Sequence, residues 1–278
     1  MPVLGEMPFY QPEVFQAFAR VNKYKPSFEY ADIIDNYQQS LKQREQQQML
    51  YAMLSVTQAL TAFNVSYFIS GGSLIGYWRH HGLIPWDDDV DMMIDAEKWP
   101  VARKVLSCLP DLQLNMGSDY MWKVFHKDSD LWEGEGYLKF PYIDVFLYRK
   151  DSEHIWPLTI WLKRMFIAPV SHVFPTQKGI FEGWPVMVPY RTAECLQLEY
   201  GSGHFGDGVM TDCYSRTFKR RERFLVPVGD RTNMPCSVLA EVYPFVRRIK
   251  RDKATHTVLE ERVLATHILS RFNTTYRE

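Results

Sequence analysis

The stretch that decides the fold runs from residue 69 to residue 95 and reads Ile-Ser-Gly-Gly-Ser-Leu-Ile-Gly-Tyr-Trp-Arg-His-His-Gly-Leu-Ile-Pro-Trp-Asp-Asp-Asp-Val-Asp-Met-Met-Ile-Asp. It starts with a glycine-serine turn, and fourteen residues after Ser73 a run of carboxylates leads into an apolar strand. Open backbone amides can bind an anion, and clustered carboxylates can hold a divalent cation. The stretch therefore predicts a site for phosphate groups and a metal ion.

The flanking patterns predict alternating strands and helices. Residues 65–70 read as a buried strand, Gly71 and Gly72 make the turn, and Ser73 is placed to cap a short helix that ends near Gly82. Further strands are expected at residues 88–94, 142–148 and 183–188, the last as an edge strand because it contains Pro185. Apolar residues at helical spacing predict a long helix before them, at residues 37–63.

This alternation predicts an α/β or α+β fold. Residues 1–36 have no clear periodicity and are expected to form an arm, whereas residues 37–205 form the core. Residues 206–278 are expected to be helical, with helices at 237–253 and 257–272, and to pack on the same domain.

Composition excludes several classes of protein. The chain has 278 residues, 46% of them hydrophobic, and a formal net charge of −1, so no global field favours nucleic acid. Its four cysteines have no metal-binding spacing, which argues against structural zinc and leaves one disulfide open. The N-terminus lacks the pattern of a signal peptide. The most apolar later stretch, residues 155–170, is interrupted by Lys163 and Arg164, so no membrane span is expected.

The acidic run predicts the metal ligands. Side chains alternate along a strand, so Asp87, Asp89 and Asp91 should share one face and Asp88 should point away. Alternate carboxylates at this spacing suit the metal ions of phosphoryl-transfer sites. Asp144 is the third candidate ligand, because its strand is otherwise too apolar for an unpartnered charge.

Calcium is excluded as the cation of an EF-hand loop. Asp87, Asp89 and Asp91 match the first three ligands of such a loop, but the sixth position is Met92 and the twelfth is Lys98. Glycine and glutamate are required there. Mg²⁺ is therefore the expected ion, with Mn²⁺ as the alternative.

The glycine turn predicts the phosphate contacts. Gly71, Gly72 and Ser73 lie between a strand and a helix, where amides and the helix terminus favour anions. Arg79, two helical turns further on, and Lys123 are candidates to neutralise a phosphate. The sequence has no Walker A motif, no G-x-G-x-x-G and no G-x-S-x-G elbow.

Three neighbours of the acidic run have two open interpretations each. His80 and His81 either assist proton transfer or are ordinary helix-end histidines. Trp86 either stacks on a base or is a buried structural residue. The sequence does not decide between these alternatives.

The stretch 68–94 resembles the signature of the LicD family, which includes fukutin-related proteins. The resemblance rests on the glycine-rich start, an arginine, the segment Gly-Leu-Ile-Pro-Trp-Asp and the Asp-x-Asp strand. Weaker similarities follow at residues 141–146, 181–189 and 198–201, so the resemblance covers about residues 65–205.

The resemblance implies a nucleotidyltransferase-like mixed sheet flanked by helices, with the C-terminal helices as additions. It implies transfer of phosphocholine, ribitol phosphate or a similar group from a CDP-activated donor to a glycan hydroxyl. Asp89, Asp91 and Asp144 would then bind the metal ion and Asp87 would be an auxiliary acid. Gly72 and Ser73 would contact phosphate, and Arg79 would face the donor.

Two alternative functions remain at this point. One is nucleotidyl transfer from an NTP to a small phosphate or alcohol, and the other is a relative that binds nucleotide or glycan without catalysis. Family members are found in the Golgi or in bacterial cytoplasm, and the sequence leaves the compartment and the oligomeric state open.

Overall fold

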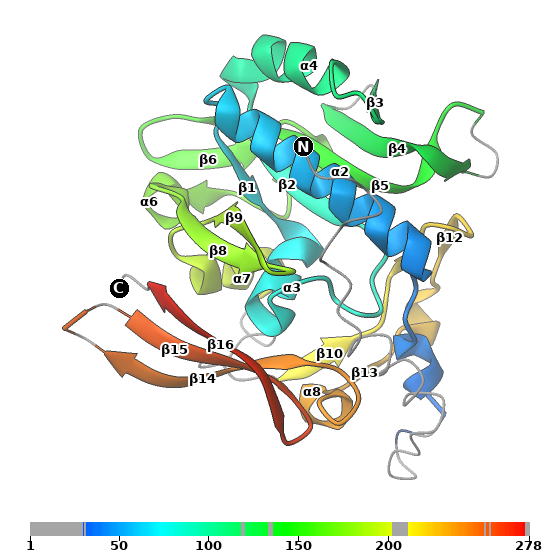
Figure 1. Cartoon of the computed structure of the whole chain (residues 1–278), viewed down its shortest axis with the longest axis vertical. Coiled ribbons are helices and arrows are strands. Elements are labelled where there is room, and N and C mark those ends of the chain that lie inside the picture. The colour runs from blue at the N-terminus through cyan, green and yellow to red at the C-terminus, as the bar shows by residue number, and fades with distance from the viewer. Residues whose placement is uncertain are drawn as a thin grey trace.

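A seven-stranded sheet lies at the centre of the computed structural model, which describes residues 30, 32–117, 120–132, 136–201, 211–252, 254–255 and 257–275 (Figure 1). Its main strands follow the order β1 (Tyr67–Ile69), β2 (Val90–Asp95), β5 (Lys139–Lys150), β4 (Met121–Leu131) and β3 (Leu112–Met116). Strands β6 (His154–Pro157) and β7 (Ala168–Pro169) extend it beside β5. Among the described pairings of this sheet, β2 and β5 are parallel and the others antiparallel.

Helices flank this sheet, and the predicted mixed α/β architecture is confirmed. The long helix α2 (Gln43–Ala62) packs across β4 and β5, and α4 (Trp99–Ser107) lies beside α2 after the short turn η4 (Ala96–Lys98). The apolar stripe that predicted α2 is buried against the sheet, as its members Met49, Met53, Val56 and Leu60 show. The helix forms there because these side chains recur every three or four residues.

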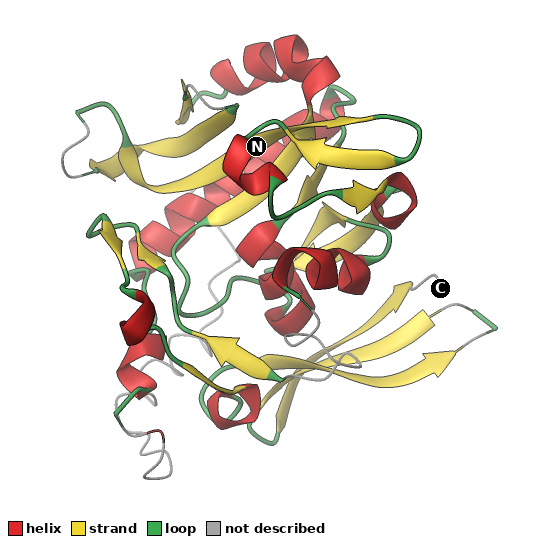
Figure 2. Ribbon diagram, turned by 180° about the vertical axis from the view of Figure 1, so that it is seen from behind, coloured by secondary structure: helices red, strands yellow, loops and turns green. Residues whose placement is uncertain are grey.

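The far edge of the sheet carries the elements that surround the site. Helix α3 (Gly71–His80) follows β1 directly and packs against β2 and α7 (Thr192–Tyr200). The hairpin of β8 (Gln177–Phe181) and β9 (Trp184–Val188) packs on β1. Two short helices, α5 (Ile160–Lys163) and α6 (Val170–Val173), lie beside β6 and β7. Figure 2 shows this side of the molecule.

A second hydrophobic core joins the beginning of the described chain to residues between Cys213 and Phe245. The turn η3 (Ile34–Tyr37) packs with Trp86 and with the segment that contains β10 (Asp212–Tyr214), β13 (Asn233–Pro235) and α8 (Cys236–Leu239). The Tyr37 hydroxyl donates a hydrogen bond to the Cys213 carbonyl at 2.8 Å, and Cys213 forms a disulfide with Cys236. The described part of the expected arm is therefore built into the C-terminal region. Residues 1–29 and 31 lie outside the described residues.

The prediction of two C-terminal helices is wrong. The chain instead forms a three-stranded antiparallel sheet of β14 (Phe245–Asp252), β15 (Thr257–Leu264) and β16 (His267–Thr275), which lies below α3 in Figure 1. Buried positions in β15 include Glu260 and Arg262, whose charges concealed the alternation of a strand. Glu260 is buried because it pairs with His81 and Arg248, at 2.9 Å and 2.8 Å.

The remaining short elements lie between α7 and β14. They are the hairpin of β11 (Phe218–Lys219) and β12 (Phe224–Leu225) and the turn η6 (Val228–Asp230). Within the described residues, no helix is both long enough and apolar enough to cross a membrane.

Candidate active site

The structure brings three of the predicted carboxylates together where β2 and β5 lie side by side in the interior of the sheet. Asp91 and Asp144 are register partners in the parallel pair β2 and β5, and Asp89 lies just before β2. Ligand oxygens of Asp89, Asp91 and Asp144 lie within 4.8 Å of one another. This set of three carboxylates, two of them buried, fits a divalent cation that prefers oxygen ligands.

The two glycines let these carboxylates approach the turn. Gly71 has a φ of +56°, and a Cβ there would lie 2.6 Å from Oδ2 of Asp91. A Cβ on Gly72 would lie 2.8 Å from Oδ2 of Asp87. A larger side chain at either position would make an acid shift, and at Gly71 it would also strain a backbone conformation that favours glycine.

Ser73 does not cap the helix, contrary to the prediction from the sequence. Helix α3 already begins at Gly71, with Ser70 in the capping position, so Ser73 lies inside the first turn and does not cap the helix. Its Oγ accepts a hydrogen bond from the Asp91 backbone N–H at 2.8 Å. The buried hydroxyl therefore fixes the strand beside the site, and Ser73 does not line the cavity described below.

Lys123 lies next to the carboxylates on the other side of β5. It is the register partner of Asp144 in the antiparallel pair β4 and β5, and its Nζ lies 2.6 Å from Oδ1 of Asp144. The same ammonium lies 3.8 Å from the centre of the Tyr142 ring. Asp91, Asp144 and Lys123 thus form one row across three adjacent strands, and Lys123 faces the site as predicted.

Arg220 is the principal site residue that the sequence did not reveal. Its guanidinium pairs with Asp89, lies 2.9 Å from Oδ1 of Asp88 and lies 3.8 Å from Oδ1 of Asp87. It comes from the turn between β11 and β12, 132 residues after Asp88. The cluster of buried acids itself required a cation nearby.

Asp88 faces away from the cavity and holds the segment that contains Arg216 and Arg220. Its Oδ2 lies 2.6 Å from Nη1 of Arg216 and also accepts a hydrogen bond from the Arg220 backbone N–H at 3.1 Å. Asp87, Asp89 and Asp91 line the cavity, whereas Asp88 does not. The alternation argued from the sequence therefore describes the geometry, although the regular strand starts only at Val90.

The packing of the acids raises their pKa values. Burial raises the pKa of Asp89 well above its usual range, and burial raises that of Asp91 to about 7, in both cases against the field of Arg220 and with added repulsion from neighbouring acids. Burial lowers the pKa of Arg220, but the surrounding carboxylates outweigh it and raise the value well above normal. A cluster that accommodates a guanidinium in this way has the electrostatics of a cation site.

Helix α7 contributes Glu199, a further site residue that the sequence did not single out. Glu199 accepts a hydrogen bond from the Gly71 backbone N–H, and its pKa is raised to about 8 by burial and by Asp91. Tyr200 follows it, and both residues line the same cavity as the carboxylates. Only the weak motif at residues 198–201 hinted at this segment.

These groups share a cavity of about 850 Å³. The acids, Gly71 and Gly72 form one wall, and residues of the segment from Tyr214 to Arg220 form another. Aromatic and apolar side chains of β4, β5 and α5 line the third side. The volume suits a ligand larger than a single sugar or phosphate.

Arg79 reaches the cavity but is also held by the C-terminal region. Its Nη2 donates to the Asp212 carbonyl at 2.9 Å, and Nη1 lies 3.6 Å from Sγ of Cys213. Burial lowers its pKa to about 10. Arg79 therefore connects α3 to β10, in addition to facing the site as predicted.

His80, His81 and Trp86 have structural contacts. His80 Nδ1 donates to the Pro244 carbonyl at 2.7 Å, and burial lowers its pKa to about 3, so proton transfer by His80 near neutral pH is disfavoured. His81 pairs with Glu260 at 2.9 Å. The Trp86 Nε1–H donates to the Tyr214 carbonyl at 3.0 Å, and its ring is buried in the second core.

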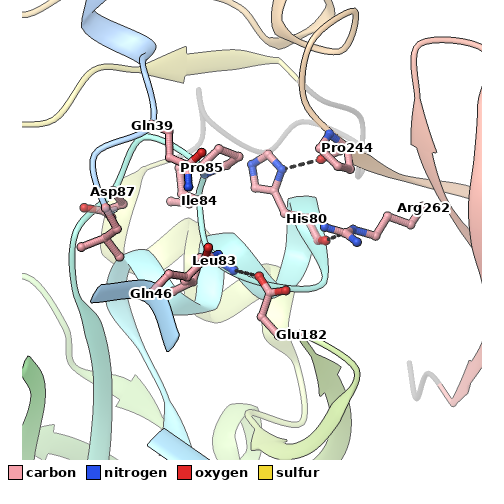
Figure 3. Close-up of a pocket in the computed structure, with 11 residues that line it drawn as sticks. Gln39, Gln46, His80, Leu83, Ile84, Pro85, Asp87, Glu182, Pro244 and Arg262 are labelled. Carbon is pink, nitrogen blue, oxygen red and sulfur yellow. Dashed lines mark hydrogen bonds between the residues drawn. The ribbon is translucent and has the colours of Figure 1, made fainter. Parts of the chain in front are cut away.

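A small pocket lies beside Asp87, and its lining residues hold the loop that precedes the acidic run (Figure 3). Glu182 accepts a hydrogen bond from the Leu83 backbone N–H at 2.9 Å, and Arg262 donates to the His80 carbonyl at 2.8 Å. The β8–β9 hairpin and the C-terminal sheet thus fix the chain between α3 and the acids.

Comparison with known proteins finds a family model that covers much of this site. Residues 64–191 match the model described as LicD/FKTN/FKRP, nucleotidyltransferase domain. The chain contains a LicD domain. The resemblance drawn from the motifs is thereby confirmed, and the LicD match covers the glycine turn and all four predicted acids.

Curated relatives of the LicD domain are similar over the same region. The lipopolysaccharide cholinephosphotransferase LicD of Haemophilus influenzae is 29% identical over 128 residues, which make up 41% of this chain and 48% of that protein. An uncharacterized protein of Rickettsia prowazekii is 31% identical over 118 residues, or 38% of this chain and 41% of its own. The chain spans about half the length, or less, of these curated relatives.

Two solved structures show distant similarity. ANT(2")-Ia in complex with adenylyl-2"-tobramycin aligns over 50% of this chain and 68% of its own, with a TM-score of 0.36 and 16% identity. The lincosamide adenylyltransferase LnuA with bound lincomycin aligns over 59% and 89%, with a TM-score of 0.36 and 13% identity.

Proposed function

We propose that this chain is a Mg²⁺-dependent transferase that moves a phosphate-linked group from a CDP-activated donor to a glycan hydroxyl. The observation that carries the proposal is the convergence of Asp89, Asp91 and Asp144 beside Lys123 and Arg220 in one large cavity. Three acids for a metal ion and two cations for phosphates are the groups that phosphoryl transfer needs.

The donor pyrophosphate would lie between the acids and the basic segment. A divalent cation held by Asp89, Asp91 and Asp144 would neutralise charge that develops on the phosphate oxygens. In the proposed arrangement Arg220 leaves the carboxylates and pairs with the donor phosphates, and Lys123 stays beside Asp144. Both residues then hold the donor in line for attack.

The acceptor hydroxyl attacks the phosphorus that carries the transferred group. A new oxygen–phosphorus bond forms, the bond to the bridging oxygen breaks, and CMP leaves. Asp87 accepts the hydroxyl proton, because it lines the cavity outside the trio of metal ligands and burial raises its pKa. Among the described residues, Glu199 is the other cavity carboxyl outside the trio, so the two acids are to be compared as bases.

Product analysis tests this proposal directly. The protein is incubated with CDP-choline, CDP-ribitol or CDP-glycerol and a glycan acceptor, with Mg²⁺ or with EDTA. Metal-dependent release of CMP from one donor supports the proposal. Release of pyrophosphate from an NTP would instead establish nucleotidyl transfer, and binding without either product would indicate a non-catalytic relative.

A further inference from the structure

The segment that follows β6 exposes large apolar side chains next to one another. Ile160, Trp161, Met165 and Ile167 have exposed fractions of 66%, 48%, 45% and 49%. Two side chains between them, Leu162 and Phe166, are buried and anchor the segment to the main core. Residues 160–167, named the apolar segment below, thus expose four large apolar side chains within eight residues, which marks an interaction surface.

Basic residues accompany the apolar segment. Lys163 and Arg164 lie within it and are exposed, and Nζ of Lys163 lies 5.3 Å from the Trp156 ring centre. No Asp or Glu occurs in the sequence between Glu153 and Glu182. Such a surface combines apolar anchors with positive charge, as does a peripheral contact with anionic lipids.

The apolar segment is continuous with the cavity. Trp161, Leu162 and Met165 line it, and the Trp161 ring packs edge-on against Phe146 with centroids 5.8 Å apart. Phe146 lies two residues after Asp144 on β5. The apolar segment therefore begins at the mouth of the cavity that holds the carboxylates.

We propose that the apolar segment rests on an anionic membrane surface, with Ile160, Trp161 and Ile167 at the boundary between head groups and acyl chains. Tryptophan is favoured at that depth, and eight residues are too short to span the bilayer. The mouth of the cavity would then face the membrane, so a membrane-anchored acceptor could reach the acids. That consequence rests on the proposed function, whereas the membrane contact does not.

A second copy of the chain fits this surface less well. In a two-fold dimer the same patch meets itself, so Lys163 and Arg164 of one copy would lie close to those of the other. This juxtaposition of like charges opposes burial of the apolar segment, whereas anionic head groups would neutralise it.

Vesicle flotation with the whole chain tests the proposal without any turnover. Vesicles of phosphatidylcholine alone are compared with vesicles of phosphatidylcholine and phosphatidylglycerol. We expect binding to the mixed vesicles that weakens with added salt. Ile160→Glu and Ile167→Glu should each lower the bound fraction about tenfold, and Arg164→Glu about fivefold or more.

The matched control is Val228→Glu in η6, because Val228 is 78% exposed and lies outside the apolar segment. This variant should bind the vesicles like the wild type, and circular dichroism should show that all variants are folded. The proposal is overturned if the wild type binds neither vesicle or if Val228→Glu loses as much binding as Ile160→Glu. Light scattering that shows a dimer broken by Ile160→Glu, without vesicle binding, would assign the apolar segment to self-association. Release of CMP from a soluble donor is measured separately, so failure of the membrane contact and failure of the proposed function remain distinguishable.

Discussion

The two walls of the cavity differ in how they are built. The acidic wall stands on the central sheet, where Asp91 and Asp144 are neighbours on paired strands with apolar residues on either side. The basic wall, which carries Arg216 and Arg220, consists of strands of two or three residues. It is held by the disulfide, by Asp88 and by Arg79. The acidic wall is thus part of a continuous sheet, whereas the basic wall depends on a few links, and substrate-driven movement is expected on the basic side.

The largest expected effect is on the acidic wall. Asp91→Asn should lower kcat/KM by about a thousandfold or more, because a ligand to the metal ion is lost. The fold should persist in EDTA, since one repelling charge is removed. Steady-state CMP release measures the effect, with Asp130→Asn on the exposed part of β4 as the control. Equal activity of both variants would exclude the proposed metal site.

A smaller loss is expected on the basic wall. Arg220→Gln should lower kcat/KM about a hundredfold, because a charged contact to the donor phosphates is removed. In EDTA it should also lower Tm, because the buried acids lose their cation. Mg²⁺ should raise the Tm of the variant more than that of the wild type. Arg221→Gln is the control, since Arg221 pairs with Glu45 and does not line the cavity. If Mg²⁺ raises the Tm of Arg220→Gln no more than that of the wild type, Arg220 and the metal ion do not neutralise the same acids.

The links of the basic wall give the third test. Removing the disulfide with Cys213→Ser should lower the free energy of unfolding by about 2–4 kcal/mol, as for other native disulfides. Activity should fall with it, while the Mg²⁺-dependent rise in Tm should remain, because the acidic wall is unaffected. Denaturant unfolding compares this variant with Cys108→Ser, whose thiol is free and exposed. Loss of the Mg²⁺ response would show that the two walls are not independent.

The smallest effect concerns Glu199, which lies between the walls. Its pKa of about 8 in the folded protein exceeds the ordinary value of 4.5, so the folded state binds the proton more tightly. Stability should therefore fall as pH rises from about 4.5 to 8 in EDTA. Glu199→Gln should remove about 1–2 kcal/mol of this fall after allowance for solvent screening. Tm curves for both proteins across that pH range measure the difference, and parallel curves would refute the raised pKa of Glu199.

The same variant also compares the two candidate bases, because activity should survive in Glu199→Gln and be lost in Asp87→Asn.

The acidic wall could be anticipated from the sequence and the basic wall could not. Alternation along one strand separates Asp88 from its neighbours, and an isolated acid in an apolar strand identifies Asp144. Both arguments use only nearby residues. Arg220 and Glu199 reach the site through tertiary packing, which no local pattern records. The C-terminal strands were missed for a related reason. Glu260 and Arg262 are buried because each has a polar partner, Arg248 and the His80 carbonyl respectively, so charged residues did not mark the exposed face.

The row formed by Asp91, Asp144 and Lys123 also bears on how the sheet aligns during folding. The strand around Asp144 is apolar on both sides and could pair with β4 in several offsets. A shift by two residues would place Asp144 opposite Met121 or Phe125 and leave a carboxylate and an ammonium without their partner. The residues proposed to serve catalysis therefore also select one register between the strands. Replacing them with apolar residues is expected to abolish activity and also to weaken the preference for that register.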